Sequence, residues 1–211
     1  MPQLKLISLC DYLTDTDVRW RKEDFRAHKM VKALKGDPIN GYFSSRVGGK
    51  WREYDKTNVQ QFVDRLPRAL FANIRRFFAD DATIVPIPNS HVVSVDTPEF
   101  KTLEIAEKIA HNSKGLFAAV PALVFKKAQQ KSRLGGPRDA AHFEEAYKIT
   151  ASLEGPIILY DDVCTTGGHL IAAYHRLNSK KSPVVLACTF GRSTKQQAEN
   201  PVGLREGCLE V

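Results

Sequence analysis

Two adjacent carboxylates followed by threonines and glycines form the segment of this chain with the clearest chemistry. In IILYDDVCTTGGHL, residues 157–170, an apolar run leads to Asp161 and Asp162, and the loop 164–169 follows before a helical pattern resumes. The pattern predicts a buried strand, a tight loop and a helix N-terminus. Such a loop offers backbone N–H groups, hydroxyls and the positive end of a helix dipole, which together bind a phosphate monoester.

The residues around this loop indicate what accompanies the phosphate. Gly167 and Gly168 let the backbone approach a ligand closely. Carboxylates at the end of a strand accept hydrogen bonds from a vicinal diol, or hold a hydrated Mg²⁺ indirectly. A diol beside a phosphate is the pattern of ribose 5-phosphate. The alternative is a strand–turn–helix corner in which Asp161 and Asp162 only cap the helix.

Composition excludes several classes of protein. With 211 residues and 43% hydrophobic content, the chain is long enough for one full core with an appendage. It has no apolar run near the roughly 20 residues of a membrane span, and its first residues do not resemble a signal peptide. Its four cysteines have no CxxC spacing, which argues against a zinc site and a disulfide scaffold. We therefore expect a cytoplasmic protein with no membrane contact.

The charge of the chain indicates polyanionic partners without choosing among them. A net charge of +7 fits small polyanions, nucleic acid or acidic proteins, although no motif indicates nucleic acid. Basic residues gather in two stretches, 19–35 and 126–138. We interpret the first as a solvated face.

The order of apolar patterns predicts an α/β fold. Before residue 80 we expect a helix near 24–34, a hairpin around Gly48-Gly49 and a helical stretch that Pro67 divides. Beyond it, strands alternate with helices, which predicts a mainly parallel sheet flanked by helices. The expected strands are 83–88, 122–125, 147–149, 157–161 and 184–190, and the expected helices are 97–112, 139–146 and 170–177.

These elements suggest three parts. Residues 1–80 form an N-terminal α+β appendage, residues 81–192 form the core, and residues 193–211 form an irregular C-terminal tail. Ligands of such parallel sheets bind at the carboxyl ends of the strands, where the acids and the sequence Pro88-Asn89-Ser90 are expected.

The segment 157–170 resembles the phosphoribosyl-pyrophosphate (PRPP) signature of type I phosphoribosyltransferases. The resemblance implies that fold, with the appendage as a hood. It also implies that Asp161 and Asp162 bind the ribose 2- and 3-hydroxyls. The residues implied to cradle the 5-phosphate are Cys164, Thr165, Thr166, Gly167, Gly168 and His169. His169 stands where the family usually has Thr or Ser, so a phosphate bond from its side chain would depend on pH.

Two further loops take roles from the same resemblance. Asn89 and Ser90 would contact pyrophosphate, although the stretch also reads as a turn stiffened by prolines. The basic loop 126–138 would close over PRPP, with Arg133 and Arg138 gripping the leaving group. Its alternative is a charged surface connection.

The sequence of these pieces resembles the ComF-like phosphoribosyltransferases over residues 83–190. Two features of that family are absent: its Arg-Gly-Phe-Asn element, where SVDTPEFK stands, and its N-terminal four-cysteine zinc ribbon. These departures leave the acceptor unresolved.

The expected protein is thus an enzyme that transfers 5-phosphoribosyl from PRPP to a nucleobase-like nitrogen and releases pyrophosphate. Mg²⁺ would be bound through PRPP near Asp161 and Asp162, without direct protein ligands. Two other functions stay open: a regulator that senses PRPP or a nucleotide and acts on nucleic acid or protein, and a hydrolase that reuses the pocket. A homodimer is compatible with the sequence.

Overall fold

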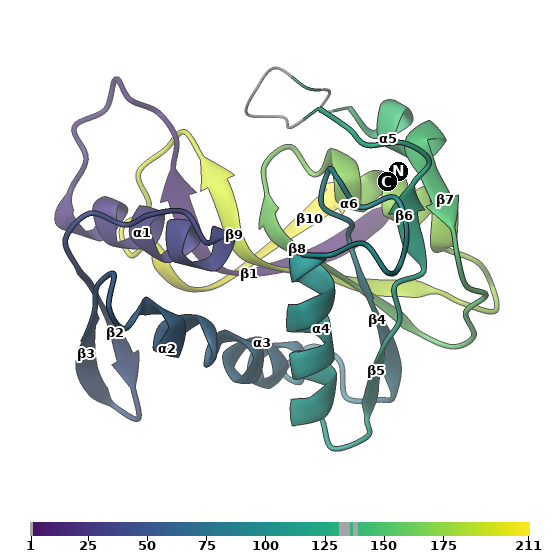
Figure 1. Cartoon of the computed structure of the whole chain (residues 1–211), viewed down its shortest axis with the longest axis horizontal. Coiled ribbons are helices and arrows are strands. Elements are labelled where there is room, and N and C mark those ends of the chain that lie inside the picture. The colour runs from purple at the N-terminus through teal and green to yellow at the C-terminus, as the bar shows by residue number, and fades with distance from the viewer. Residues whose placement is uncertain (1, 131–135, 137–138) are drawn as a thin grey trace.

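The computed structural model describes residues 2–130, 136 and 139–211 of the chain. A six-stranded sheet in the order β10-β1-β9-β8-β4-β5 forms its centre (Figure 1). All neighbouring strands are parallel except β1 and β10. The strands are β1 (Gln3–Leu13), β4 (Ala82–Pro86), β5 (Phe117–Ala119), β8 (Ile157–Cys164), β9 (Val184–Thr194) and β10 (Val202–Glu210). The predicted α/β class with a mainly parallel sheet is confirmed.

Helices cover both faces of this sheet. They are α1 (Lys22–Lys35), α2 (Val59–Val63), α3 (Leu66–Ile74), α4 (Lys101–Asn112), α5 (Ala140–Ala146) and α6 (Gly168–Leu177). The hairpin of β2 (Phe43–Val47) with β3 (Lys50–Tyr54) and the antiparallel pair of β6 (Leu123–Phe125) with β7 (Tyr147–Ile149) complete the fold. The pair β6–β7 is separate from the central sheet, although both of its strands were predicted from the sequence.

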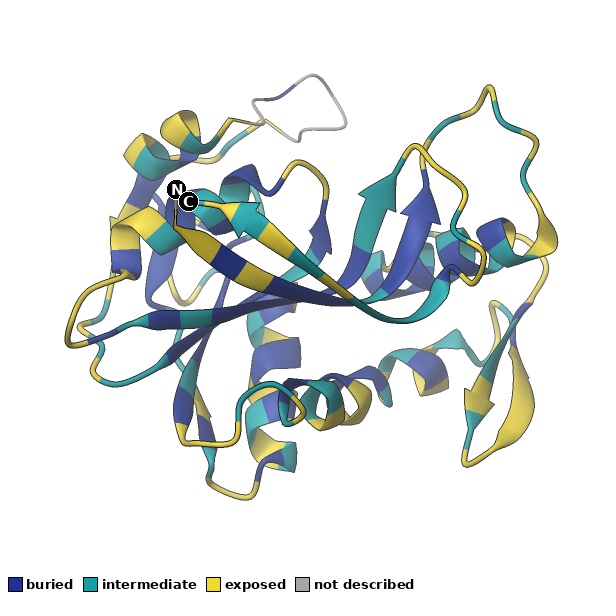
Figure 2. Ribbon diagram, turned by 180° about the vertical axis from the view of Figure 1, so that it is seen from behind, coloured by how far each residue is buried: buried dark blue, intermediate teal, exposed yellow. Residues whose placement is uncertain are grey.

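Alternation along the strands supplies both layers of the core. Ile158 on β8 joins the buried cluster formed with α1, α3 and α4, whereas its neighbour Leu159 joins the cluster formed with α5 and α6. Successive side chains of a strand point to opposite faces, so a nearly continuous apolar run suits a sheet that is covered twice. Figure 2 shows the resulting buried strands at the centre.

Several local predictions agree with the structure. Helix α1 and the hairpin β2–β3 lie where we expected them, and α2 ends before α3 begins, with Pro67 in the first turn of α3. Asp139 caps α5, because its side chain accepts a hydrogen bond from the N–H of His142. Proline suits a first helical turn, where its missing N–H has no intrahelical partner.

The predicted start of α4 is wrong. We expected a helix over residues 97–112, but the helix begins at Lys101. The hydroxyl of Thr97 instead accepts a hydrogen bond of 3.0 Å from the N–H of Ser94, and Glu99 has φ 60°. A local side-chain turn has therefore displaced the helix by several residues.

Both ends of the chain contribute strands that the sequence did not reveal. The predicted irregular tail contains β10, which pairs with β1 in an antiparallel register that joins Gln3 to Glu210. An ion pair of 3.1 Å between Lys5 and Glu206 links the same two strands. Strand β1, from the predicted appendage, thus lies inside the central sheet between β9 and β10.

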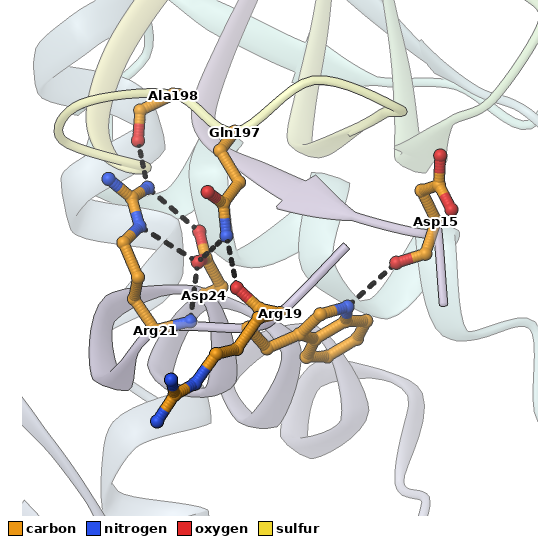
Figure 3. Close-up of polar contacts among 7 residues, drawn as sticks. Asp15, Arg19, Arg21, Asp24, Gln197 and Ala198 are labelled. Carbon is orange, nitrogen blue, oxygen red and sulfur yellow. Dashed lines mark hydrogen bonds and ion pairs between the residues drawn. The ribbon is translucent and has the colours of Figure 1, made fainter. Parts of the chain in front are cut away.

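A polar network holds α1 against the connection between β9 and β10 (Figure 3). Asp24, which is 1% exposed, accepts a bond of 3.0 Å from Arg21 Nε and another of 3.0 Å from Gln197 Nε2. Gln197 also donates to the backbone carbonyl of Arg19. The hydrogen bond from Arg21 is the main cause of a lowered pKa at Asp24. This network fixes α1 near the carboxyl ends of β1 and β9.

No helix in the described part of the chain is long and apolar enough to cross a membrane. All four cysteines are free thiols.

Candidate functional site

Asp161 and Asp162 lie in the second half of β8, between β9 and β4. We predicted that the strand ends at Asp161, but it continues to Cys164 because its pairing with β9 extends to Arg192. Both acids are half-buried. The structure therefore places them near the carboxyl edge of the sheet, on one of its central strands.

The two acids differ in their surroundings. The N–H of Asp162 donates a bond of 2.8 Å to Oδ1 of Asp161. Burial of the Asp161 carboxyl group raises its pKa well above the usual value, and the negative charge of Asp162 raises it further. Burial raises the pKa of Tyr147, and the charge of Asp161 adds to this effect. Asp161 thus holds a proton more readily than an exposed aspartate.

A loop of only three residues joins β8 to α6. Thr165 and Thr166 are exposed, and Gly167 adopts φ 84° as the N-cap of the helix. The helix begins at Gly168, and the N–H of Ile171 bonds to the carbonyl of Gly167 at 2.9 Å. The first N–H groups of a helix have no intrahelical acceptor, so the start of α6 has the geometry and the charge to receive an anion.

The structure explains the need for a glycine at position 167 without any ligand. A Cβ on this residue would stand 2.8 Å from Cδ2 of Leu209, on β10. The left-handed φ is also strained for residues other than glycine. A substitution here would disturb the loop and β10 together, so loss of phosphate binding in such a variant would not by itself identify a phosphate cradle.

His169 uses its side chain for packing. Its ring centroid lies 3.7 Å from that of Phe143, and the rings of Phe125 and Tyr147 complete the cluster. Burial, with a smaller effect from His142, lowers the pKa of His169 to about 4. The imidazole is therefore neutral near pH 7 and belongs to the contact of α6 with α5. The backbone N–H of His169 still lies in the first turn of α6.

Cys164 is a buried thiol at the end of β8. Burial, followed by the charge of Asp161, raises its pKa to about 12. A thiolate is thus disfavoured although a helix N-terminus is near, and Cys164 acts as a small packing residue.

The segment that carries Asn89 and Ser90 lies beside the acids. Strand β4 pairs in parallel with β8, and the N–H of Ile87 bonds to the carbonyl of Tyr160 at 2.8 Å. Strand β4 ends at Pro86, two residues earlier than predicted. Oδ1 of Asn89 is buried and has no hydrogen-bond partner among the described residues. A buried acceptor without a donor is costly, which makes this amide a marker for a missing ligand or water.

The first residues of the basic loop contact the same segment. The N–H of Gln129 donates a bond of 2.6 Å to the carbonyl of Ser90, and Oε1 of Gln129 lies 2.9 Å from Nε2 of His142. Arg133 and Arg138 lie outside the described residues. The structure thus brings the first residues of the segment after β6 to the segment after β4.

The sequence did not reveal two residues, Lys35 and Tyr12, that interact electrostatically with the acids. The charge of Lys35, the last residue of α1, lowers the pKa of Asp161, although burial outweighs this effect. Lys101 donates a bond of 2.9 Å to the carbonyl of Lys35. Burial, followed by the charge of Asp162, raises the pKa of Tyr12 to about 12. Lys35 belongs to the first basic stretch, but no local pattern indicated that it lies near Asp161.

Comparison with protein-family models and with curated protein sequences gave no match. Among solved structures, the chain is similar to UMP synthase of Leishmania donovani, with 16% identity, a TM-score of 0.39 and 82% of this chain covered. The chain spans about a third of that protein, 32% of its length. A likeness at this level identifies neither a family nor an activity.

Proposed function

We propose that this protein binds PRPP and transfers its 5-phosphoribosyl group to a nitrogen nucleophile, with release of pyrophosphate. The observation that carries the proposal is the direct succession of two acids on a central parallel strand, a three-residue loop and a helix N-terminus. A phosphate at the start of α6 would place its attached sugar toward Asp161 and Asp162. Few ligands other than a ribose 5-phosphate need a diol site and a phosphate site so close together.

In this proposal each loop has a separate task. Thr165, Thr166 and the first N–H groups of α6 bind the 5-phosphate, and the acids accept hydrogen bonds from the ribose hydroxyls. Asn89 and Ser90 would face the pyrophosphate, to which the amide NH₂ of Asn89 and the hydroxyl of Ser90 can donate hydrogen bonds. Arg133 and Arg138, outside the described residues, would stabilise the departing charge.

The donor set fits Mg²⁺ that arrives with the substrate. The described residues contain no group of three or more His, Cys, Asp or Glu arranged to hold a metal. Mg²⁺ usually keeps several waters and binds through one or two carboxylates together with substrate phosphates. Mg²⁺ would be held through PRPP near Asp161 and Asp162, without direct protein ligands, and would neutralise charge on the pyrophosphate. Because the pKa of Asp161 is raised, binding of PRPP with its Mg²⁺ would displace a proton from Asp161.

Catalysis would then come mainly from position and charge. The transition state at C1 of the ribose resembles an oxocarbenium ion, so the negative pair near the sugar and the cations near the leaving group would stabilise it together. The proposal includes the type I phosphoribosyltransferase fold, with residues 81–192 in the core together with β1 and β10. Helices α1, α2 and α3 and the hairpin β2–β3 would form the hood over the acceptor.

The alternative is a regulator that binds PRPP without consuming it. The basic surface and the packed imidazole of His169, in place of the family's hydroxyl residue, favour this second candidate.

Release of pyrophosphate from PRPP tests the proposal and separates the two candidates. The protein is incubated with Mg²⁺, PRPP and single nucleobases, and pyrophosphate is measured with a coupled assay. An enzyme should release it only with a suitable base, and Asp162→Asn should slow the release by about 100-fold or more, as expected for a group at the reacting sugar. Saturable PRPP binding without release by any base would favour the regulator.

A further inference from the structure

Helix α1 and the hairpin β2–β3 carry the largest exposed aromatic side chains of the described chain. Trp51 is 55% exposed, Tyr42 52% and Phe25 51%. They come from three places in the sequence, but α1 and the hairpin lie next to each other (Figure 1). Lys29 on α1 donates a bond of 3.0 Å to the carbonyl of Tyr42, which joins the two elements. We call the surface formed by Trp51, Arg26, Arg46, Lys29 and Tyr42 the Trp51 face.

Two arginines hold the ring of Trp51. Arg46, its cross-strand partner on β2, and Arg26, on α1, each place the guanidinium carbon 5.3 Å from the ring centroid. Guanidinium groups over an indole are attracted by its π electrons. Nε of Arg26 is buried and has no hydrogen-bond partner among the residues described. The ring thus lies close to two cations, while the Trp51 residue stays 55% exposed.

The elements that carry Trp51 and its two arginines contain more cations than acids. The sequence of α1, KEDFRAHKMVKALK, has five Lys or Arg and two acids, and one of these acids, Asp24, is buried and paired with Arg21. The strands FSSRV and KWREY add three cations and one acid. Exposed cations in such excess attract a polyanion.

We propose that the Trp51 face binds single-stranded nucleic acid. Proteins that bind single strands combine a basic surface along the backbone with aromatic rings on which bases stack. Both parts are present here, and the two arginines beside Trp51 can bind the phosphates on either side of a stacked base. An acidic peptide would use the cations but would leave the open indole ring without a planar partner. The inference goes beyond the proposed transferase and does not depend on it.

Fluorescence anisotropy with labelled 20-nucleotide strands of mixed sequence, DNA and RNA in turn, tests this proposal. We expect saturable binding by the full chain that weakens steeply with salt. Trp51→Ala should lower the affinity roughly 5- to 150-fold, the range for one lost stacked base, without changing the salt slope. Trp51→Phe should keep most of the affinity, and Arg46→Gln should lower the salt slope by about one.

The controls separate stacking from charge and from folding. Ile149→Ala removes another exposed side chain, on β7, and should leave binding unchanged. The double variant Asp161→Asn/Asp162→Asn should bind the strands at least as well as the parent protein. Strand binding is therefore tested independently of PRPP binding. Three results would overturn the proposal: no binding of either strand, equal binding by a folded Trp51→Ala variant, or displacement by poly-glutamate at the same charge concentration.

Discussion

Leu209 of β10 covers Gly167 so closely that a Cβ on the glycine would lie 2.8 Å from Cδ2 of the leucine. The last strand of the chain therefore braces the loop between β8 and α6. Gly167→Ala should lower the free energy of unfolding by about 2–3 kcal/mol, because a strained left-handed φ adds to a steric overlap. Denaturation in urea measures this loss.

Gly155 is the matched control, since it has φ 78° but nothing within 4 Å of the position of its Cβ. Gly155→Ala should cost about 1–2 kcal/mol, from backbone strain alone. In the background of Leu209→Ala, the additional cost of Gly167→Ala should fall toward this control value. Equal costs for Gly167→Ala in both backgrounds would show that Leu209 does not restrict the loop.

The pair Asp161 and Asp162 should make stability depend on pH. Because the pKa of Asp161 is raised in the folded protein, the folded state binds this proton more tightly than the unfolded state. Stability from this group is therefore complete near and below the ordinary pKa of 3.8 and is lost as the pH rises through the folded pKa. Asp161→Asn should be more stable than the parent at pH 8, and this advantage should disappear near pH 4.

Urea denaturation at several pH values measures this effect, with Asp81→Asn as a control at an exposed aspartate outside the site. An Asp161→Asn protein that gains nothing at pH 8 relative to pH 4 would mean that the acid is not held in its protonated form.

His169 should affect stability in acid but not the pH dependence of phosphate binding. Its lowered pKa, about 4 against an ordinary 6.5, means that the folded protein resists protonation. The stabilising effect is complete above pH 6.5 and is lost as the pH falls through about 4. His169→Leu should flatten the stability profile in this window, whereas His111→Leu, at an exposed site, should not.

The same His169→Leu variant tests how His169 would meet a phosphate. If only its backbone N–H takes part, the affinity for PRPP with Mg²⁺ should change by less than about threefold, under 0.7 kcal/mol. A loss of tenfold or more in a folded variant would show that the imidazole itself contacts the ligand.

Asp24 should be the strongest link between α1 and the connection from β9 to β10. Asp24→Ala removes a buried acceptor from Arg21 and Gln197 and should cost about 2–3 kcal/mol, less than a fully buried pair because Arg21 can be rehydrated. Glu23→Ala, in the same helical turn, should cost about 0.5 kcal/mol. Similar costs for both variants would show that Asp24 acts only through the helix dipole.

The sequence revealed those parts of the site that local patterns determine. The run 157–160, the two acids and the glycines lie within a few residues, so a strand, a loop and a helix were predicted there, although β8 continues to Cys164 and α6 begins at Gly168. The helix predicted over 139–146 corresponds to α5 (Ala140–Ala146). The predicted start of α4 was wrong because the hydroxyl of Thr97 accepts a hydrogen bond within a turn, from the N–H of Ser94, and does not cap the helix.

The rest depends on contacts between distant segments. Strand β10 contains Gly203 and Gly207, which weaken its alternation, and it is specified by pairing with β1 almost 200 residues earlier. Lys35 and Tyr12 interact with the acids only because β1 enters the sheet beside β9 and α1 packs against β1 and β8. No local pattern in the sequence predicted that the ring of His169 would pack against Phe143.

Calorimetric titration of PRPP with Mg²⁺ into the parent protein and into Asp161→Asn/Asp162→Asn tests whether the two acids form a PRPP site. We expect saturable binding by the parent, release of protons on binding, and an affinity at least about 30-fold lower in the double variant, equal to roughly 2 kcal/mol. A folded double variant that binds as tightly as the parent, or a folded parent that does not bind PRPP, would contradict this expectation.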